Sequence, residues 1–234
     1  MVKLGNFEQR IQPHDLLSNN EVLLDARIPS RVHETIHLEL AVTNEQKSAS
    51  LDLIHNQYSK RGYSPPLSLE DHDQWITFIA AENSGQVIGT ISVRPDTIHG
   101  LFADETYQDH LNELRQQGNR LSEFGRLALR PVACNRHILS ELFYLAYLYL
   151  RTQCNCSMGV LEINPRHAKY YEKKLGLYRI GPLRHCTRVS APSVLMSADF
   201  PFLEGRVKKQ GYFLETAWAF LPTHHINIQE SRNF

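Results

Sequence analysis

Apolar residues gather most densely in the second half of the chain, and their spacing there alternates between strand-like and helix-like. The run LSEFGRLAL (121–129) is almost continuously apolar, as in a strand buried on both faces, and it stops at Arg130-Pro131. From about Arg136 to Thr152 the apolar residues fall at helical spacing on nearly all sides, which predicts a buried helix. Gly159–Ile163 predicts a short core strand. Two such strands joined by a helix predict a right-handed β-α-β unit with parallel strands.

A second helix is predicted directly after this unit. Asn164 is a good N-cap, Pro165 suits the first helical position, and Gly176 stands where a helix end favours a left-handed residue. The strands and helices between Leu121 and Leu177 therefore form one continuous block. We expect the functional site in this block.

The flanking sequence predicts further strands and helices. Strands are expected at 35–42, 75–81, 87–93, 177–180 and 193–196, and helices at 44–60 (with Asn44 as the cap), at 103–117 and from Phe202 onwards. A hairpin turn at 82–85 joins the second and third of these strands. This order predicts an α/β (α+β) fold with a mixed sheet and helices on both faces, in one domain over residues 31–222. Residues 1–30 are expected to be an N-terminal extension, and 223–234 a C-terminal tail.

The composition argues against nucleic-acid binding, a membrane span and a metal site. The 234 residues carry 25 basic and 25 acidic side chains, so nothing indicates an electrostatic surface for nucleic acid. The longest apolar run, near 138–150, is too short to span a bilayer, and no signal-peptide pattern follows Met1. The four cysteines lack zinc-site spacing, so we expect reduced thiols and no metal. A cytoplasmic protein that is not integral to a membrane is expected.

Two charges lie inside the predicted buried strand 121–129, namely Glu123 and Arg126. A buried charge needs a partner or a function. Strand alternation places these two side chains on opposite faces, whereas a bulge near Gly125 would bring them together. The sequence leaves open whether they form a structural ion pair or belong to a functional site.

Two segments resemble the GNAT acyltransferase superfamily. Its central hairpin is similar to WITFIAAENSGQVIGTISVRP (75–95), and its last conserved strand and helix are similar to EINPRHAKYYEKKLGL (162–177). The resemblance implies a mostly antiparallel central sheet in which two parallel strands splay apart, with a pantetheine arm in the gap. Leu127, Ala128 and Leu129 are then expected to bind that arm.

The sequence departs from the superfamily at the turn that binds the acyl donor. The superfamily's glycine-rich turn, which holds the diphosphate of coenzyme A, corresponds here to RPVACNRHI (130–138), which contains no glycine. A pantetheine arm presented on acyl carrier protein does not need that turn. Asn135, Arg136 and the helix N-terminus can bind its single phosphate.

A closer resemblance fits this donor. The strand LSEFGRLAL is similar to the E-x-x-R strand shared by acyl-homoserine-lactone synthases and FeeM-type N-acyl amino acid synthases. The FeeM-type family in particular is similar to RGYSPP (61–66), GLFADETYQDHLNELRQQGNR (100–120), NPRHAKYY (164–171) and APSVLM (191–196). The resemblance covers about Tyr58 to Asp199. It implies transfer of a long-chain acyl group from acyl carrier protein to the amine of an amino acid, without a metal or a tightly bound cofactor.

This chemistry suggests roles for the catalytic candidates. Glu123 is the candidate base or amine anchor, and Arg126 is the candidate for the acceptor's carboxylate. Tyr171 best matches the superfamily's proton-donating tyrosine, but YEKKLG has one residue more before Gly176 than the usual pattern, which leaves Tyr170 as an alternative.

Further residues are candidates for binding. The acceptor or acyl pocket is expected to include His167, Tyr170, Tyr63 and Trp75. Arg115, Arg120 and Arg136 are candidates to meet an acidic carrier protein. For each of these residues a packing or surface role stays open.

Three rival functions stay open. The first is a coenzyme A-dependent N-acetyltransferase of the same fold, which the missing glycine turn disfavours. The second is an acyl-homoserine-lactone-type signal synthase, disfavoured because the helix before RGY lacks an arginine-rich pattern. The third is a non-catalytic module that binds acyl groups or carrier protein. The sequence does not indicate which amino acid or chain length is used.

Overall fold

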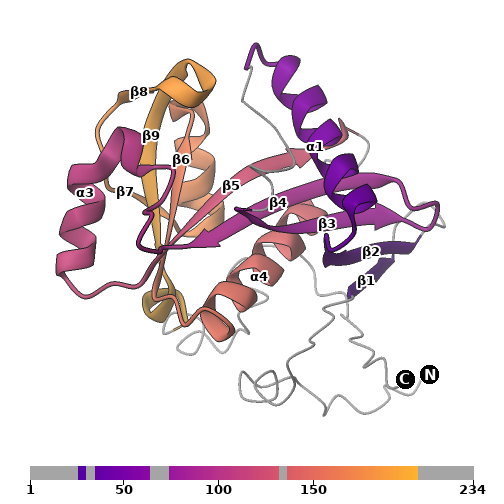
Figure 1. Ribbon diagram of the computed structural model, residues 1–234, viewed down its shortest axis with the longest axis horizontal. Coiled ribbons are helices and arrows are strands. Elements are labelled where there is room, and N and C mark those ends of the chain that lie inside the picture. The colour runs from indigo at the N-terminus through magenta and orange to yellow at the C-terminus, as the bar shows by residue number, and fades with distance from the viewer. Residues whose placement is uncertain (1–25, 30–34, 64–73, 132–135, 205–234) are drawn as a thin grey trace.

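The computed structural model describes residues 26–29, 35–63, 74–131 and 136–204 (Figure 1). Its strands are β1 (Ala26–Pro29), β2 (Thr35–Leu40), β3 (Ile76–Glu82), β4 (Val87–Pro95), β5 (Leu121–Leu129), β6 (Met158–Ile163), β7 (Tyr178–Arg179), β8 (Arg184–Cys186) and β9 (Ala191–Asp199). Its helices are α1 (Asn44–Ser59), α3 (Asp104–Gln116), α4 (Arg136–Thr152) and α5 (Ala168–Tyr170), with shorter turns η3 (Pro165–His167), η4 (Tyr171–Leu175) and η5 (Thr187–Val189).

The strands form one sheet in the order β1-β2-β3-β4-β5-β6-β9-β7, and β8 pairs with β9. β5 and β6 are parallel, while the other described pairs are antiparallel. The β-α-β unit is therefore β5-α4-β6. This confirms the predicted mixed, mostly antiparallel sheet.

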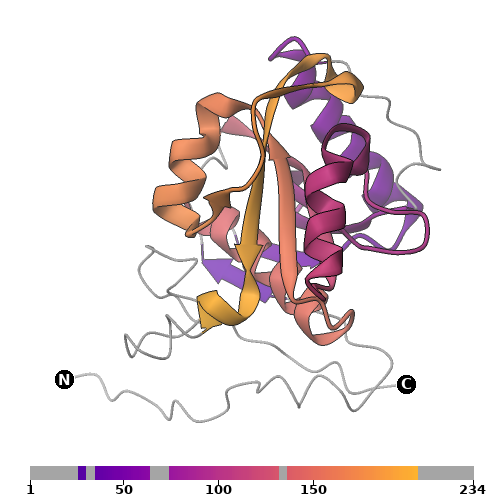
Figure 2. The same ribbon diagram turned by 90° about the vertical axis from the view of Figure 1, so that its left-hand side faces the viewer.

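Helices cover both faces of the sheet. α1 lies on one face of β4 and β5, and α4 lies on the opposite face of β3 and β4, where it completes the largest apolar core (Figure 1). Farther along the sheet, β6 and β9 lie between α3 on one side and the η3-α5-η4 segment on the other (Figure 2). The predicted helices on both faces are confirmed.

The parallel strands β5 and β6 splay apart. They pair from Leu121↔Met158 to Phe124↔Leu161, and β5 then continues to Leu129 without β6. At the point of separation the register between β4 and β5 shifts, so that Ile91 alone faces both Arg126 and Leu127. Such a bulge bends and twists its strand, which turns β5 away from β6. The splay implied by the family resemblance is therefore present.

The start of α1 differs from the prediction by one residue. The N-cap is Thr43 rather than Asn44, because Gln46 stands at the spacing of a capping box. The Thr43 hydroxyl accepts from the Gln46 N–H at 3.2 Å, and the Gln46 side chain accepts from the Thr43 N–H at 3.0 Å. The residue three positions after Asn44 is neither Glu nor Gln, so Asn44 cannot form a capping box.

The helix predicted between Asn164 and Gly176 is not a regular α-helix. Asn164 caps it as expected, but it runs through a 3₁₀ turn (η3), one α turn (α5) and a π turn (η4) before Gly176 at φ 67°. A π turn accommodates one extra residue in a helix, as the longer YEKKLG run requires. The strands β1 and β8 have no counterpart among the predicted elements. Residues 200–204 begin the predicted C-terminal helix, and its remainder lies outside the described residues.

Candidate active site

A pocket of about 650 Å³ opens where β5 and β6 part. One wall is formed by residues 124–129 of β5 and the other by residues 161–164 at the end of β6, with side chains from α1 and α4 completing it. This volume is in the range of small-molecule sites. The pocket brings together every predicted site residue whose side chain is described: Tyr63, Trp75, Glu123, Arg126, Leu127, Ala128, Leu129, His167, Tyr170 and Tyr171. Asn135 and the side chain of Arg136 lie outside the described residues.

Glu123 is a buried carboxyl in the wall of this pocket, only 2% exposed. Its Oε2 accepts hydrogen bonds from the backbone N–H groups of Phe102 (2.7 Å) and Ala103 (3.2 Å), just before α3. Burial raises the pKa of Glu123 to about 7, although Arg188 and the two N–H groups act in the opposite direction. A carboxyl with this pKa can accept a proton near neutral pH, which is what a general base requires.

Arg188 and Glu162 complete the charged part of the pocket. Arg188 NH1 lies 3.7 Å from Glu123 Oε1, and Arg188 NH2 contacts Glu162 Oε2 at 2.5 Å. Glu162 Oε1 also accepts from the Ser193 hydroxyl at 2.8 Å. The described ion pair of Glu123 is thus with Arg188 and not with Arg126. This corrects the alternative in which Glu123 and Arg126 form a structural pair.

Sequence reasoning missed both Arg188 and Glu162. Glu162 had a usable signal, since it is a charge in an apolar strand just as Glu123 is. Arg188 had none, because it lies in a short turn, η5, whose position depends on the pairing of β8 with β9.

Arg126 and Trp75 form the wall next to the bulge. Arg126 takes a left-handed conformation (φ 51°), and its guanidinium carbon lies 5.3 Å from the centroid of the Trp75 ring. The Trp75 ring is stacked on Phe102 at 5.3 Å with an interplanar angle of 8°. It also lies against Gly125, where an added Cβ would approach Trp75 Cη2 to 2.8 Å. The bulge therefore places Arg126 in the pocket, but beside Trp75.

The structure separates the two candidate tyrosines. Burial raises the pKa of Tyr171 above its usual range, and its ring lies 6.3 Å from that of Phe143. Tyr170, the next residue, is 40% exposed. A third tyrosine, Tyr58 of α1, has its pKa raised to about 12 by burial and also lines the pocket. Both predicted candidates line the pocket, and Tyr171 is the more buried of the two.

Tyr63 and His167 lie at the rim near the start of η3. The Tyr63 hydroxyl accepts from Asn164 Nδ2 at 3.0 Å. Partial burial, together with the charges of Arg166 and Arg61, lowers the pKa of His167, which favours a neutral imidazole at pH 7. A neutral imidazole can donate or accept a hydrogen bond with a bound ligand.

Two of the arginines proposed to meet a carrier protein are engaged inside the molecule. Arg115 binds Asp96 and Asp104, and Arg120 binds the backbone oxygen and side chain of Asn155. Within the described residues no three His, Cys, Asp or Glu side chains are grouped as metal ligands. The described helices include none that is long and apolar enough to cross a membrane.

Solved structures of similar fold include FeeM, an N-acyl amino acid synthase from uncultured soil microbes, at 24% identity and a TM-score of 0.65. That match covers 72% of this chain and 92% of FeeM. A putative N-acetyltransferase from Lactobacillus plantarum matches at 17% identity over 70% of this chain and 98% of its own, with a TM-score of 0.53. The AHL synthase LasI matches at 14% identity over 70% and 90%, with a TM-score of 0.50.

These structures share the GNAT-like fold of the chain, and the sequence itself identifies the family. No curated protein sequence matches the chain. Residues 49–199, well over half of the chain, match the family described as N-acyl amino acid synthase FeeM. This segment contains the pocket-lining part of α1, both splayed strands, α3 and the Glu123–Arg188–Glu162 cluster. The chain belongs to the FeeM family of N-acyl amino acid synthases and is an acyltransferase.

Proposed function

We propose that this acyltransferase moves a long-chain acyl group from the phosphopantetheine thioester of acyl carrier protein to the amine of an amino acid. The observation that carries the proposal is Glu123, a buried carboxyl with a pKa of about 7 in the wall of the pocket. An amino acid arrives with a protonated amine, which must lose a proton before it can attack a thioester. We therefore assign the role of base to Glu123.

The reaction further needs a proton for the leaving thiolate and hydrogen-bond donors for the tetrahedral oxyanion. Glu123 takes one proton from the ammonium group, and the resulting neutral amine attacks the thioester carbon. As the tetrahedral intermediate collapses, the C–S bond breaks and the leaving thiolate takes a proton from Tyr171. The nitrogen then loses its second proton, which restores Tyr171, and Glu123 later releases its proton to solvent. The products are an amide and a free thiol. Backbone N–H groups of the splayed part of β5 are the proposed donors to the tetrahedral oxyanion.

The acceptor site is proposed to lie between Glu123 and Arg126. Arg126 offers a planar guanidinium that suits a two-pronged contact with the acceptor's carboxylate. The Trp75–Phe102 stack contacts both groups, since Arg126 lies over Trp75 and Phe102 N–H donates to Glu123. Tyr63, His167 and Tyr170 also line the pocket. An amino acid, with its amine and carboxylate on one carbon, fits such a pair of opposite charges.

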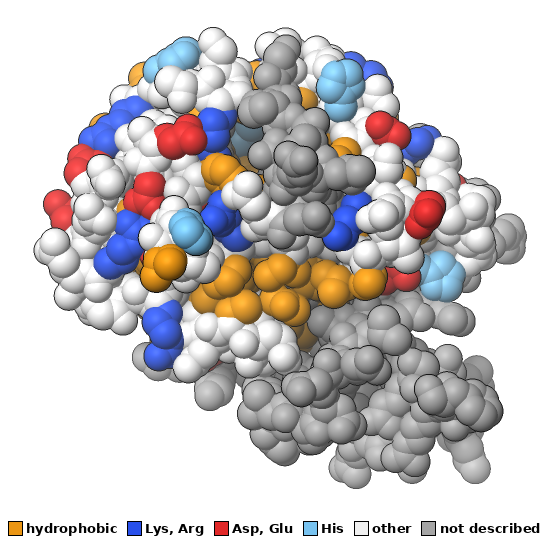
Figure 3. All heavy atoms as spheres, viewed as in Figure 1, with side chains coloured by type: hydrophobic (Ala, Val, Ile, Leu, Met, Phe, Trp, Pro, Cys, Tyr) orange, Lys and Arg blue, Asp and Glu red, His pale blue; other side chains and the backbone are white. Residues whose placement is uncertain are grey.

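The donor is proposed to lie along residues 125–129 of β5, where backbone groups no longer pair with β6. Leu127, Leu129, Leu139 and Phe143 supply apolar surface for the acyl chain. Figure 3 shows apolar side chains in a band across one face with basic side chains on either side, an arrangement that suits a ligand with an apolar chain and an anionic group. Asn135 and Arg136 are proposed to bind the single phosphate, and we propose that the reaction takes place in the cytoplasm.

Mass spectrometry of lipid extracts from bacteria that express the chain tests this proposal. New amide-linked acyl amino acids are expected with the native chain and should vanish with Glu123→Gln, which keeps the shape of the side chain but removes the carboxylate. Their masses would identify both acceptor and chain length. Acetyl-coenzyme A turnover without a new lipid would replace the proposal by a coenzyme A-dependent N-acetyltransferase. Absence of both activities, with retained binding of acyl carrier protein, would leave a binding module.

A further inference from the structure

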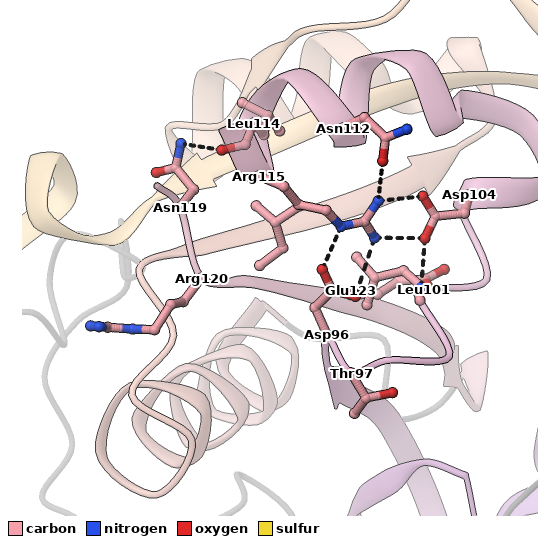
Figure 4. Close-up of polar contacts among 12 residues, drawn as sticks. Asp96, Thr97, Leu101, Asp104, Asn112, Leu114, Arg115, Asn119, Arg120 and Glu123 are labelled. Atoms are coloured by element: carbon pink, nitrogen blue, oxygen red, sulfur yellow. Dashed lines mark hydrogen bonds and ion pairs between the residues drawn. The ribbon is translucent and has the colours of Figure 1, made fainter. Parts of the chain in front are cut away.

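The structure assigns Arg115 of α3 the role of a positioning residue. It binds Asp96 and Asp104 (Figure 4), which stand at the two ends of the segment that carries Phe102 and Ala103, and the backbone N–H groups of these two residues donate to Glu123. The catalytic meaning of this arrangement rests on the proposed role of Glu123 as the base. Arg115 itself is outside the pocket, and no sequence signal linked it to Glu123. From the sequence, Arg115 was a candidate to meet an acidic carrier protein.

Every N–H group of the Arg115 guanidinium is directed at an oxygen atom. Nε and NH2 donate to the two carboxylate oxygens of Asp96 at 2.7 and 3.1 Å, and NH1 and NH2 donate to the two oxygens of Asp104, both at 2.7 Å. NH1 also donates to Asn112 Oδ1 at 3.0 Å. A guanidinium has five N–H groups in a fixed plane, and this network uses all five. Lysine has three donors on one nitrogen and cannot reproduce it.

These contacts hold both ends of the segment 96–104, which links β4 to α3. Asp96 directly follows β4, and Asp104 is the first residue of α3. Asp104 Oδ2 also accepts from the Leu101 N–H at 2.7 Å. Arg94 NH2 donates to the Gly100 carbonyl at 3.1 Å. The path of the segment is therefore fixed from both ends and at its centre.

The fixed segment delivers two N–H groups to one carboxylate oxygen of Glu123. Since ionised carboxylates accept hydrogen bonds more strongly than neutral ones, these donors favour the charged form of Glu123. Among the described residues, the other charged groups around Glu123 are its cross-strand neighbour Arg94, Arg188, Glu162 and, farther along β5, Arg126. These groups belong to β4, η5, β6 and β5, whereas the two N–H donors belong to the segment that Arg115 holds.

The proposal can be tested without substrate. The variants are Arg115→Lys and, as the milder change, Asp96→Asn, which leaves the Asp104 contacts in place. Arg184→Lys is the matched control, because Arg184 also binds a carboxylate on α3, Asp109, through two bonds of 2.7 and 2.6 Å, but does not touch segment 96–104. The full-length chain, labelled with ¹³C at glutamate Cδ, is titrated by NMR, and Glu123→Gln assigns the signal. Amide hydrogen exchange is measured at Phe102 and Ala103.

We expect Arg115→Lys to raise the titration midpoint of Glu123 by about one pH unit and to speed exchange at both amides at least about tenfold. Asp96→Asn should give a smaller rise, and Arg184→Lys should leave both readouts unchanged. A native midpoint with both amides still protected in Arg115→Lys would overturn the proposal. Should that variant not fold, a native midpoint in Asp96→Asn would overturn it equally. The shifted titration without any acyl transfer would refute only the proposed function.

Discussion

Arg188 NH1 lies 3.7 Å from Glu123 Oε1, inside the wall of the pocket. This distance is too long for a hydrogen bond, so the two groups interact mainly through their charges. The positive charge partly offsets the cost of burying the carboxylate and keeps the pKa of Glu123 near neutrality. The proposed role of Glu123 as a base therefore depends on a residue 65 positions later in the chain.

The first prediction concerns the pH profile of the Arg188→Gln variant. Loss of the positive charge should raise the pKa of Glu123, so that less of the base is ionised at pH 7. We expect acyl transfer at pH 7 to fall roughly 10- to 100-fold, with recovery toward pH 9. Arg188→Lys keeps a charge nearby and should shift the profile less. An unchanged pH profile in Arg188→Gln would show that Arg188 does not tune the base.

The second prediction concerns stability as a function of pH. The pKa of Glu123 is raised in the folded protein from about 4.5 to about 7, so folding favours the protonated form. Its contribution to stability is present in full below pH 4.5 and is lost as the pH rises through 7. Relative to the native chain, Glu123→Gln should therefore gain on the order of 3 kcal/mol of unfolding free energy between pH 4.5 and pH 8.

Urea unfolding of both proteins at these two pH values measures this gain. The exposed carboxyl of Glu113 supplies the control as Glu113→Gln, for which no such gain is expected. The account of a desolvated Glu123 fails if the two Gln variants respond to pH alike.

The third prediction concerns the close contact of Gly125 with Trp75. A Cβ at Gly125 would lie 2.8 Å from Trp75 Cη2 and 3.2 Å from Cζ3, so Gly125→Ala must displace the indole or the strand. We expect a loss of about 1–3 kcal/mol of stability and a lower affinity for the acceptor. Trp75→Phe removes the atoms in conflict, so the double variant should recover part of the stability lost by Gly125→Ala. Purely additive effects in this double-mutant cycle would contradict the contact.

The fourth prediction separates Tyr171 from Tyr170. Tyr171 lies within the pocket with a raised pKa, and a protonated phenol there can donate to the leaving thiolate. Tyr171→Phe should lower kcat roughly 10- to 100-fold, whereas Tyr170→Phe should change it less than about threefold. Rates are measured with a thioester donor at saturation, so that a change in binding is not mistaken for a change in kcat. The opposite order of effects would assign the proton donor to Tyr170.

Local sequence signals predicted much of this fold. Apolar spacing placed β5, α4 and β6, and the capping residues placed the segment from Asn164 to Gly176. The extra residue in YEKKLG, which left the choice between Tyr170 and Tyr171 open, coincides with the π turn η4, and that turn was not predicted. The exact cap of α1 was missed because Thr43 and Asn44 are both good capping residues, and only the position of Gln46 distinguishes them.

Much of the candidate site was predicted from the sequence, but Glu162 of β6 was missed, as were Arg188 and Phe102 outside the strands. Glu123 and Arg126 were visible as charges in an apolar strand, and that strand carries them into the pocket. Arg188 and Phe102 were not visible, since both make non-local contacts with Glu123, Arg188 from η5 and Phe102 from the segment before α3. The pairing of Glu123 with Arg188 joins β5 to the η5 turn, a non-local contact that no local pattern specifies.

The most direct test of the central claim is the rate of amide formation by the purified protein. The donor is dodecanoyl-acyl carrier protein, the acceptors are a mixture of the twenty amino acids, and products are counted by mass spectrometry for the native chain and Glu123→Gln. We predict N-acyl amino acids with the native chain and a rate at least about 100-fold lower with Glu123→Gln at pH 7. Equal rates for the two proteins would contradict the assignment of Glu123 as the base.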